Sequence, residues 1–167
     1  AWTLTPEQLT GLKITPPANS DVDFTLTVTS TATDGTSTSS TSQTLLVTVN
    51  PVADAPSLSV SPATGNEDSA IALSIASSLT DTDGSESLSI RISGAPADAV
   101  LVSGTQTLVA SNGAWTLTPE QLTGLKITPP ANSDVDFTLT VTSTATDGTS
   151  TSSTSQTLLV TVNPVAD

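Results

Sequence analysis

Residues 137–147 read FTLTVTSTATD, and in this run Phe137, Leu139 and Val141 alternate with threonines. Successive side chains of a β-strand point to opposite faces of a sheet, so the alternation predicts a strand with one apolar face. The run at 157–162 has the same period, because its apolar residues again recur at every second position. Both runs are rich in threonine and valine or leucine, a composition that favours strands over helices.

Shorter alternating runs precede this pair, at 58–60, 71–75, 88–92, 100–102, around Leu108 and at 115–117. Gly, Pro, Asp or Asn separates them, so the sequence predicts an all-β fold of about seven to nine strands in two packed antiparallel sheets. One helical turn is expected at 118–122, with Thr118 as its N-cap and Gln121 reaching back to it. Residues 76–79 are a second candidate turn.

A long internal repeat sets the domain organisation. Residues 1–54 and 114–167 are identical, so the repeat unit is 114 − 1 = 113 residues long. Solenoid units typically have about 20–50 residues, whereas about 100–150 residues is typical of an independent domain. We therefore expect tandem domains: the second half of a preceding β-sandwich repeat at 1–50, a linker at 51–55, a complete β-sandwich repeat at 56–163, and the start of the next linker at 164–167.

The half-repeat at 1–50 poses a problem of stability. A half sandwich exposes a sheet face and open edges, and it buries too little surface to be stable alone. We therefore expect its missing first half to be supplied by another chain or by a further segment of the polypeptide.

Composition excludes several classes of function. The sequence has 16 Asp and Glu and only 3 Lys and Arg, which gives a net charge of −13. Nucleic acid is therefore a poor partner, because its phosphates would be repelled. The sequence has no His and no Cys, which excludes Ser–His catalytic triads, thiolate nucleophiles and the usual zinc ligands. The absence of Cys also excludes the disulfides that stiffen many secreted proteins. No apolar run approaches the roughly 20 residues of a membrane span, so direct membrane insertion is not expected.

The carboxylates lie in loops between predicted strands. The most informative loop reads DTDGSE at 81–86, where three acids surround a glycine. Calcium takes about 6–8 oxygen ligands, and glycine permits the tight turn that aims several of them at one point. The alternative is an ordinary turn, since Asp and Gly are favoured there anyway. Further acids in NED at 66–68, in DVD at 134–136 and at Asp54 of the linker favour calcium.

The order of these elements resembles that of cadherin-like and bacterial immunoglobulin-like repeats. FTLTVTSTATDG is followed by QTLLVTVNPVADAP, then by NED and LTDTDGSESLSIRISG, an order most similar to the extender repeats of giant bacterial RTX-type adhesins. The linker departs from animal cadherins, because NPVAD at 50–54 replaces their acid-rich form. The resemblance implies a calcium cluster at each junction between repeats, with ligands drawn from Asp54, Asp81, Asp83, Glu86, Glu67, Asp68, Asn50, Asp21, Asp23, Asp34, Asp134, Asp136, Asp147 and Asp167.

The resemblance also implies a role and a location. The chain would be a structural extender of a secreted adhesin, exported by type I secretion to the bacterial surface, where calcium ties neighbouring repeats into a stiff rod that projects a distal ligand-binding region. Extracellular calcium modules commonly have dissociation constants of about 10⁻⁴–10⁻³ M, so such sites would fill outside the cell.

Other functions compete with this one. The regular threonine row at 25–31 could form a carbohydrate- or ice-binding face, although threonine is also an ordinary residue of a solvated strand. Paired carboxylates could serve glycoside hydrolysis, but no aromatic cleft is indicated and we do not expect an enzyme. Homophilic cell–cell contact is a further alternative that no feature of the sequence supports.

Overall fold

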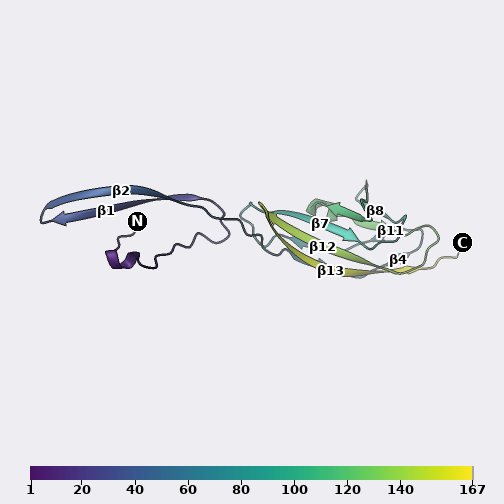
Figure 1. Ribbon diagram of the computed structural model, residues 1–167. Helices are drawn as coiled ribbons and strands as arrows, with labels where there is room; N and C mark the ends of the chain where they lie inside the picture. Colours follow the sequence, from purple (N-terminus) through teal and green to yellow (C-terminus); the bar gives the residue numbers. More distant parts are fainter. Residues whose placement is uncertain (167) are drawn as a thin grey trace. The chain divides into compact units, whose positions relative to one another are not determined.

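A computed structural model describes residues 1–166, which separate into two compact units, Ala1–Pro51 and a second unit that begins at Val52 (Figure 1). We describe each unit by itself. The first unit holds the half-repeat, and the second holds the complete one.

Strands dominate the second unit. Its strands in residues 52–166 are β3 (Ser57–Val60), β4 (Ala63–Asn66), β5 (Ile71–Ala72), β6 (Ile75–Ser78), β7 (Ser87–Ser93), β8 (Val100–Ser103), β9 (Gln106–Leu108), β10 (Ala114–Leu117), β11 (Leu125–Thr128), β12 (Phe137–Asp147) and β13 (Ser150–Asn163). They form a five-stranded sheet in the order β10-β7-β12-β13-β4, a four-stranded sheet in the order β5-β11-β8-β9, and the pair β3-β6. The predicted all-β fold is confirmed.

One hydrophobic core joins the two larger sheets. Ile92 of β7 and Val141 of β12 in the five-stranded sheet are fully buried in the same cluster as Leu101 of β8 and Ile127 of β11. Apolar residues alternate with exposed polar ones along these strands, so each sheet turns one face inward, as the sequence predicted. The two sheets therefore pack face to face as the layers of a β-sandwich.

The predicted helical turn is present, and the second candidate turn is not. Residues Pro119–Leu122 form a 3₁₀ turn, η2, and the Thr118 backbone N–H donates to the Gln121 side-chain Oε1 over 2.9 Å. Residues 76–79 lie mostly in strand β6, because their backbone pairs with β3 in the register Ser57↔Ser78. A short apolar run is compatible with either a turn or a strand, because the sequence alone does not give the strand that it pairs with.

The first unit contains the same sequence as 114–164 and less structure. It has a 3₁₀ turn, η1 (Pro6–Leu9), and one hairpin of β1 (Phe24–Asp34) and β2 (Ser37–Val47). The hairpin register Phe24↔Val47 equals the register Phe137↔Val160 of its copy. Residues 1–4 and 12–15 are not strands, although their copies 114–117 and 125–128 are β10 and β11.

Candidate metal centre

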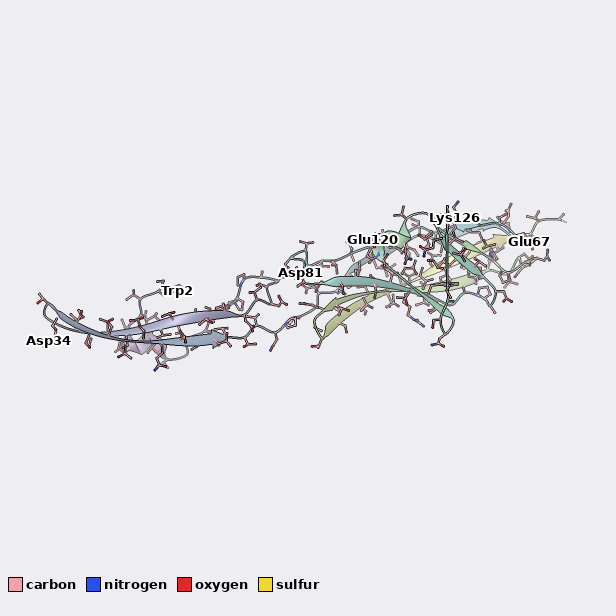
Figure 2. The ribbon with its side chains drawn as sticks, turned by 90° about the horizontal axis from the view of Figure 1, so that it is seen from above. Trp2, Asp34, Glu67, Asp81, Glu120 and Lys126 are labelled. Atoms are coloured by element: carbon pink, nitrogen blue, oxygen red, sulfur yellow. The ribbon has the colours of Figure 1, made fainter. Side chains whose placement is uncertain are left out.

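The second unit carries acidic residues at both ends of its sandwich, and Figure 2 places Asp81 at one end and Glu67 at the other. We call the end with Asp54, the 81–86 loop and Asp147 the proximal end. The distal end comprises residues 66–68, 132–136 and 162–165. The two ends differ in how deeply their carboxylates are buried.

Glu86 is the central residue of the proximal end. Only 9% of its surface is exposed, because it directly precedes β7 and lies beside the start of the unit. Its Oε1 accepts a hydrogen bond of 2.7 Å from the backbone N–H of Asp54. Its Oε2 is buried and has no hydrogen-bond partner. A buried carboxylate oxygen without a donor or a cation is energetically costly, so this atom calls for an explanation.

The rest of the 81–86 loop forms two successive turns capped by aspartates. Asp81 is 3% exposed, and its Oδ1 accepts the N–H of Asp83 over 2.9 Å. Asp83 is exposed, and its Oδ1 accepts both the hydroxyl of Ser85, over 2.6 Å, and the backbone N–H of Ser85, over 2.8 Å. The hydrogen bond from the Ser85 hydroxyl has the larger effect and the one from the Ser85 backbone N–H the smaller, and both lower the pKa of the Asp83 carboxyl below its usual value. The loop is thus an aspartate-capped turn in this structure.

The β12–β13 hairpin brings Asp147 to the same end. The β12–β7 ladder ends at the pair Thr146↔Ser87, and Asp147 and Glu86 are the residues that follow and precede this pair in the sequence. Asp147 is 5% exposed. Across the hairpin, the Ser150 hydroxyl accepts the backbone N–H of Ala53 over 2.9 Å. Three buried carboxylates of the candidate set, those of Asp81, Glu86 and Asp147, therefore belong to the proximal end.

At the distal end, carboxylates hold backbone amides. Glu67 Oε1 accepts the N–H of Val165 over 2.7 Å, and its own N–H donates to the carbonyl of Asn163, which is the copy of Asn50. Asp68, with a positive φ of 54°, accepts the N–H of Asn132 over 2.8 Å. Asp136 accepts the N–H of Val162 over 2.8 Å.

The remaining predicted ligands are less constrained. Asp134, Asp34 and Asn50 are exposed, and Asp21 is half-buried. Asp23 of the first unit accepts the N–H of Val49 over 2.7 Å, as its copy Asp136 does in the second unit. Asp167 lies outside the described residues.

No group of three or more Asp, Glu, His or Cys side chains among residues 1–166 is arranged as a ready metal site. In the proximal end, one oxygen each of Asp81, Asp83 and Glu86 accepts hydrogen bonds from backbone or hydroxyl donors. Sequence reasoning also missed Ser150, whose hydroxyl holds the linker residue Ala53. The only signal for it was its place two residues after Gly148 in the hairpin turn.

Comparisons with known proteins give little guidance. No protein family matches the chain, and no curated protein has a similar sequence. A solved structure of an endo-fucoidan hydrolase variant from glycoside hydrolase family 107 is 19% identical over 91% of this chain, with a TM-score of 0.32. The chain spans 20% of that protein's length. Within residues 1–166, no helix has the length and apolarity that crossing a bilayer requires.

Proposed function

We propose that this chain is a structural extender segment whose repeats are stiffened by calcium, and that it acts as a spacer and not as an enzyme. The observation that carries the proposal is the buried, unpartnered Oε2 of Glu86 beside the linker residue Asp54. The residues best placed to hold the ion are Glu86, Asp81 and Asp147, with Asp54 and Asp83 completing the set.

A cation from solution is the simplest partner for this carboxylate. Arg91 and Lys126, the basic residues of the second unit, have exposed side chains on β7 and β11. Removing one partner from a buried ionic site leaves a costly uncompensated charge, and a divalent ion would compensate several acids at once. Hard oxygen ligands favour calcium or magnesium over transition metals.

The linker contacts explain how an ion would stiffen the protein. Glu86 holds the N–H of Asp54, where the chain enters the repeat, and Glu67 holds the N–H of Val165, where it leaves. Val165 is the copy of Val52, so in a longer array each linker would be held by a glutamate from each neighbouring repeat. An ion bound to the second oxygen of such a glutamate fixes the side chain that holds the linker.

The proposal also includes the cellular location of the protein. An array of identical domains converts copy number into length, which suits a secreted bacterial surface adhesin that must project a distal ligand-binding region. Sites with dissociation constants of about 10⁻⁴–10⁻³ M stay empty in a low-calcium cytosol and fill outside. A chain exported by type I secretion would thus stiffen after export.

The carbohydrate- or ice-binding alternative has weaker support. The hydroxyls of Thr142 and Ser155, and those of Thr144 and Ser153, bond each other over 2.8 Å across the hairpin. Hydroxyls paired in this way are less available to a ligand. Binding of a single repeat to a glycan array or to ice would favour this alternative over the extender.

Small-angle X-ray scattering of a polypeptide with two complete repeats tests the proposal. In millimolar calcium we expect a long, well-defined maximum dimension, and with excess chelator a broader distribution. Glu86→Gln in both repeats should abolish the calcium response, because the amide keeps the shape and removes the charge. Glu120→Gln is the matched control, since Glu120 is an exposed residue of η2 and is not one of the proposed ligands. A scattering profile that is insensitive to calcium would remove calcium from the account.

A further inference from the structure

The backbone that leads into β3 is held by side chains and not by a neighbouring strand. Residues 53–56, which we call the linker segment, are not part of a strand. The Ala53 N–H donates to the Ser150 hydroxyl over 2.9 Å, and the Asp54 N–H donates to Glu86 Oε1 over 2.7 Å. Two consecutive amides are therefore bound by side chains that lie 97 and 32 residues further along the sequence.

The next two residues of the linker segment are held by their carbonyl groups. The Thr80 hydroxyl donates to the carbonyl of Ala55 over 2.7 Å, and the Thr154 hydroxyl donates to the carbonyl of Pro56, also over 2.7 Å. Pro56 is buried and has no N–H, so the carbonyl is its one backbone group that needs a partner. Each of the four residues thus has a backbone group that is bound by a side chain.

The four side chains that hold the linker segment come from the two elements that carry candidate calcium ligands. Ser150 and Thr154 belong to the β12–β13 hairpin, and they share one face of β13 because they are four residues apart. Thr80 directly precedes the 81–86 loop, and Glu86 ends it. The linker segment is therefore bound to both elements at once.

We propose that Ser150, Thr154 and Thr80 form a hydroxyl clamp that holds the linker segment, and with it Asp54, in place before an ion binds. These three are positioning residues and not ligands, and this role rests on the calcium site proposed above. Without an ion, the carboxylates at this end of the sandwich repel one another, and the neutral contacts of the clamp oppose that repulsion. A ligand that is already in place loses less conformational freedom on binding, so the clamp raises the affinity for calcium.

Hydrogen exchange of the Ala53 amide in excess chelator tests the clamp without any metal. In the 167-residue chain this amide should be protected, and Ser150→Ala should speed its exchange about two- to tenfold, the change that one hydrogen bond typically makes. Ser150→Thr keeps a hydroxyl and should restore the protection. Ser153→Ala is the matched control, because Ser153 lies on the same strand and its hydroxyl bonds that of Thr144 and not the linker segment. Amide-resolved NMR measures the exchange.

Calorimetric titration of the metal-free chain with calcium tests the positioning role. Ser150→Ala and Thr154→Val should each raise the calcium dissociation constant about two- to tenfold, although neither changes the net charge or removes a proposed ligand. Ser150→Thr should restore the affinity, and Ser153→Ala should leave it unchanged. Urea denaturation in chelator verifies that each variant is folded.

The two measurements separate failure of the clamp from failure of the proposed function. Equal exchange of the Ala53 amide in the unmodified chain and in Ser150→Ala would overturn the clamp, whether or not calcium binds. Unchanged calcium affinity in both Ser150→Ala and Thr154→Val would overturn the positioning role, as would an equal loss in Ser153→Ala. A chain that binds no calcium would overturn the proposed function and the positioning role together, and a protected Ala53 amide would then support the clamp alone.

Discussion

Gly94 shows how closely two strands approach at a single residue. It follows β7 with a φ of +89°, and a Cβ built there would lie 2.7 Å from the carbonyl oxygen of Thr138. We expect Gly94→Ala to lower the free energy of unfolding by about 2–4 kcal/mol, because left-handed strain adds to the overlap with rigid backbone. Urea denaturation followed by Trp115 fluorescence measures it.

Gly104 provides the matched control for this substitution. Its φ is +59°, but nothing lies within 4 Å of a Cβ built there. Gly104→Ala should therefore cost only the left-handed strain, about 1–2 kcal/mol. Equal losses for the two variants would contradict the close approach at Gly94.

Single residues also show what could be predicted of the candidate site. The loop positions of most of these acids could be predicted, because strands alternate and loops interrupt the alternation. Asp34 and Asp147 are exceptions, since they are the last residues of β1 and β12. The hydrogen-bond partners of these acids could not be predicted from the sequence. The N–H of Asp54 reaches Glu86 across 86 − 54 = 32 residues, and Val165 reaches Glu67 across 165 − 67 = 98. Such contacts depend on the sheet topology, which local sequence does not encode.

At the scale of elements, the two copies give a direct measure of context. Leu158 in β13 is 1% exposed, whereas Leu45, the same position of β2, is 49% exposed. Leu158→Ala should lower the free energy of unfolding by about 2–5 kcal/mol, because it opens a cavity in the core. Leu45→Ala should leave the main urea transition, reported by Trp115 fluorescence, unchanged. A comparable loss in Leu45→Ala would mean that the first unit contributes to that transition.

The same comparison limits sequence-based prediction of strands. Period-two alternation predicted β7, β12 and β13, whose apolar positions form the core. Alternation alone could not decide whether AWTL becomes a strand, because it is β10 at 114–117 and not a strand at 1–4. The two-residue strand β5 and the parallel pairing of β4 with β13 likewise depend on distant partners. Strand propensity is thus completed by tertiary pairing.

At the scale of the whole molecule, the net charge of −13 leads us to expect that cations affect stability in two ways. Salt screens repulsion among all the acids, with a Debye length of about 10 Å at 0.1 M ionic strength. A bound ion acts instead at one place, and its effect depends on its own concentration and affinity. Sodium chloride and calcium chloride at matched ionic strength therefore separate general screening from a site.

For a calcium site with a dissociation constant of about 10⁻⁴ M, 10 mM calcium is a hundredfold excess and should raise the free energy of unfolding by about 2.7 kcal/mol. Urea denaturation of the 167-residue chain in 10 mM calcium, in 10 mM magnesium and in sodium chloride of equal ionic strength measures this. Magnesium should do less, because it demands a stricter octahedral geometry and dehydrates reluctantly. The calcium increment should vanish in Glu86→Gln and persist in Glu120→Gln. Equal increments in all three salts would assign the carboxylates to solvation of the turns, since general screening depends on the ionic strength and not on which cation is present.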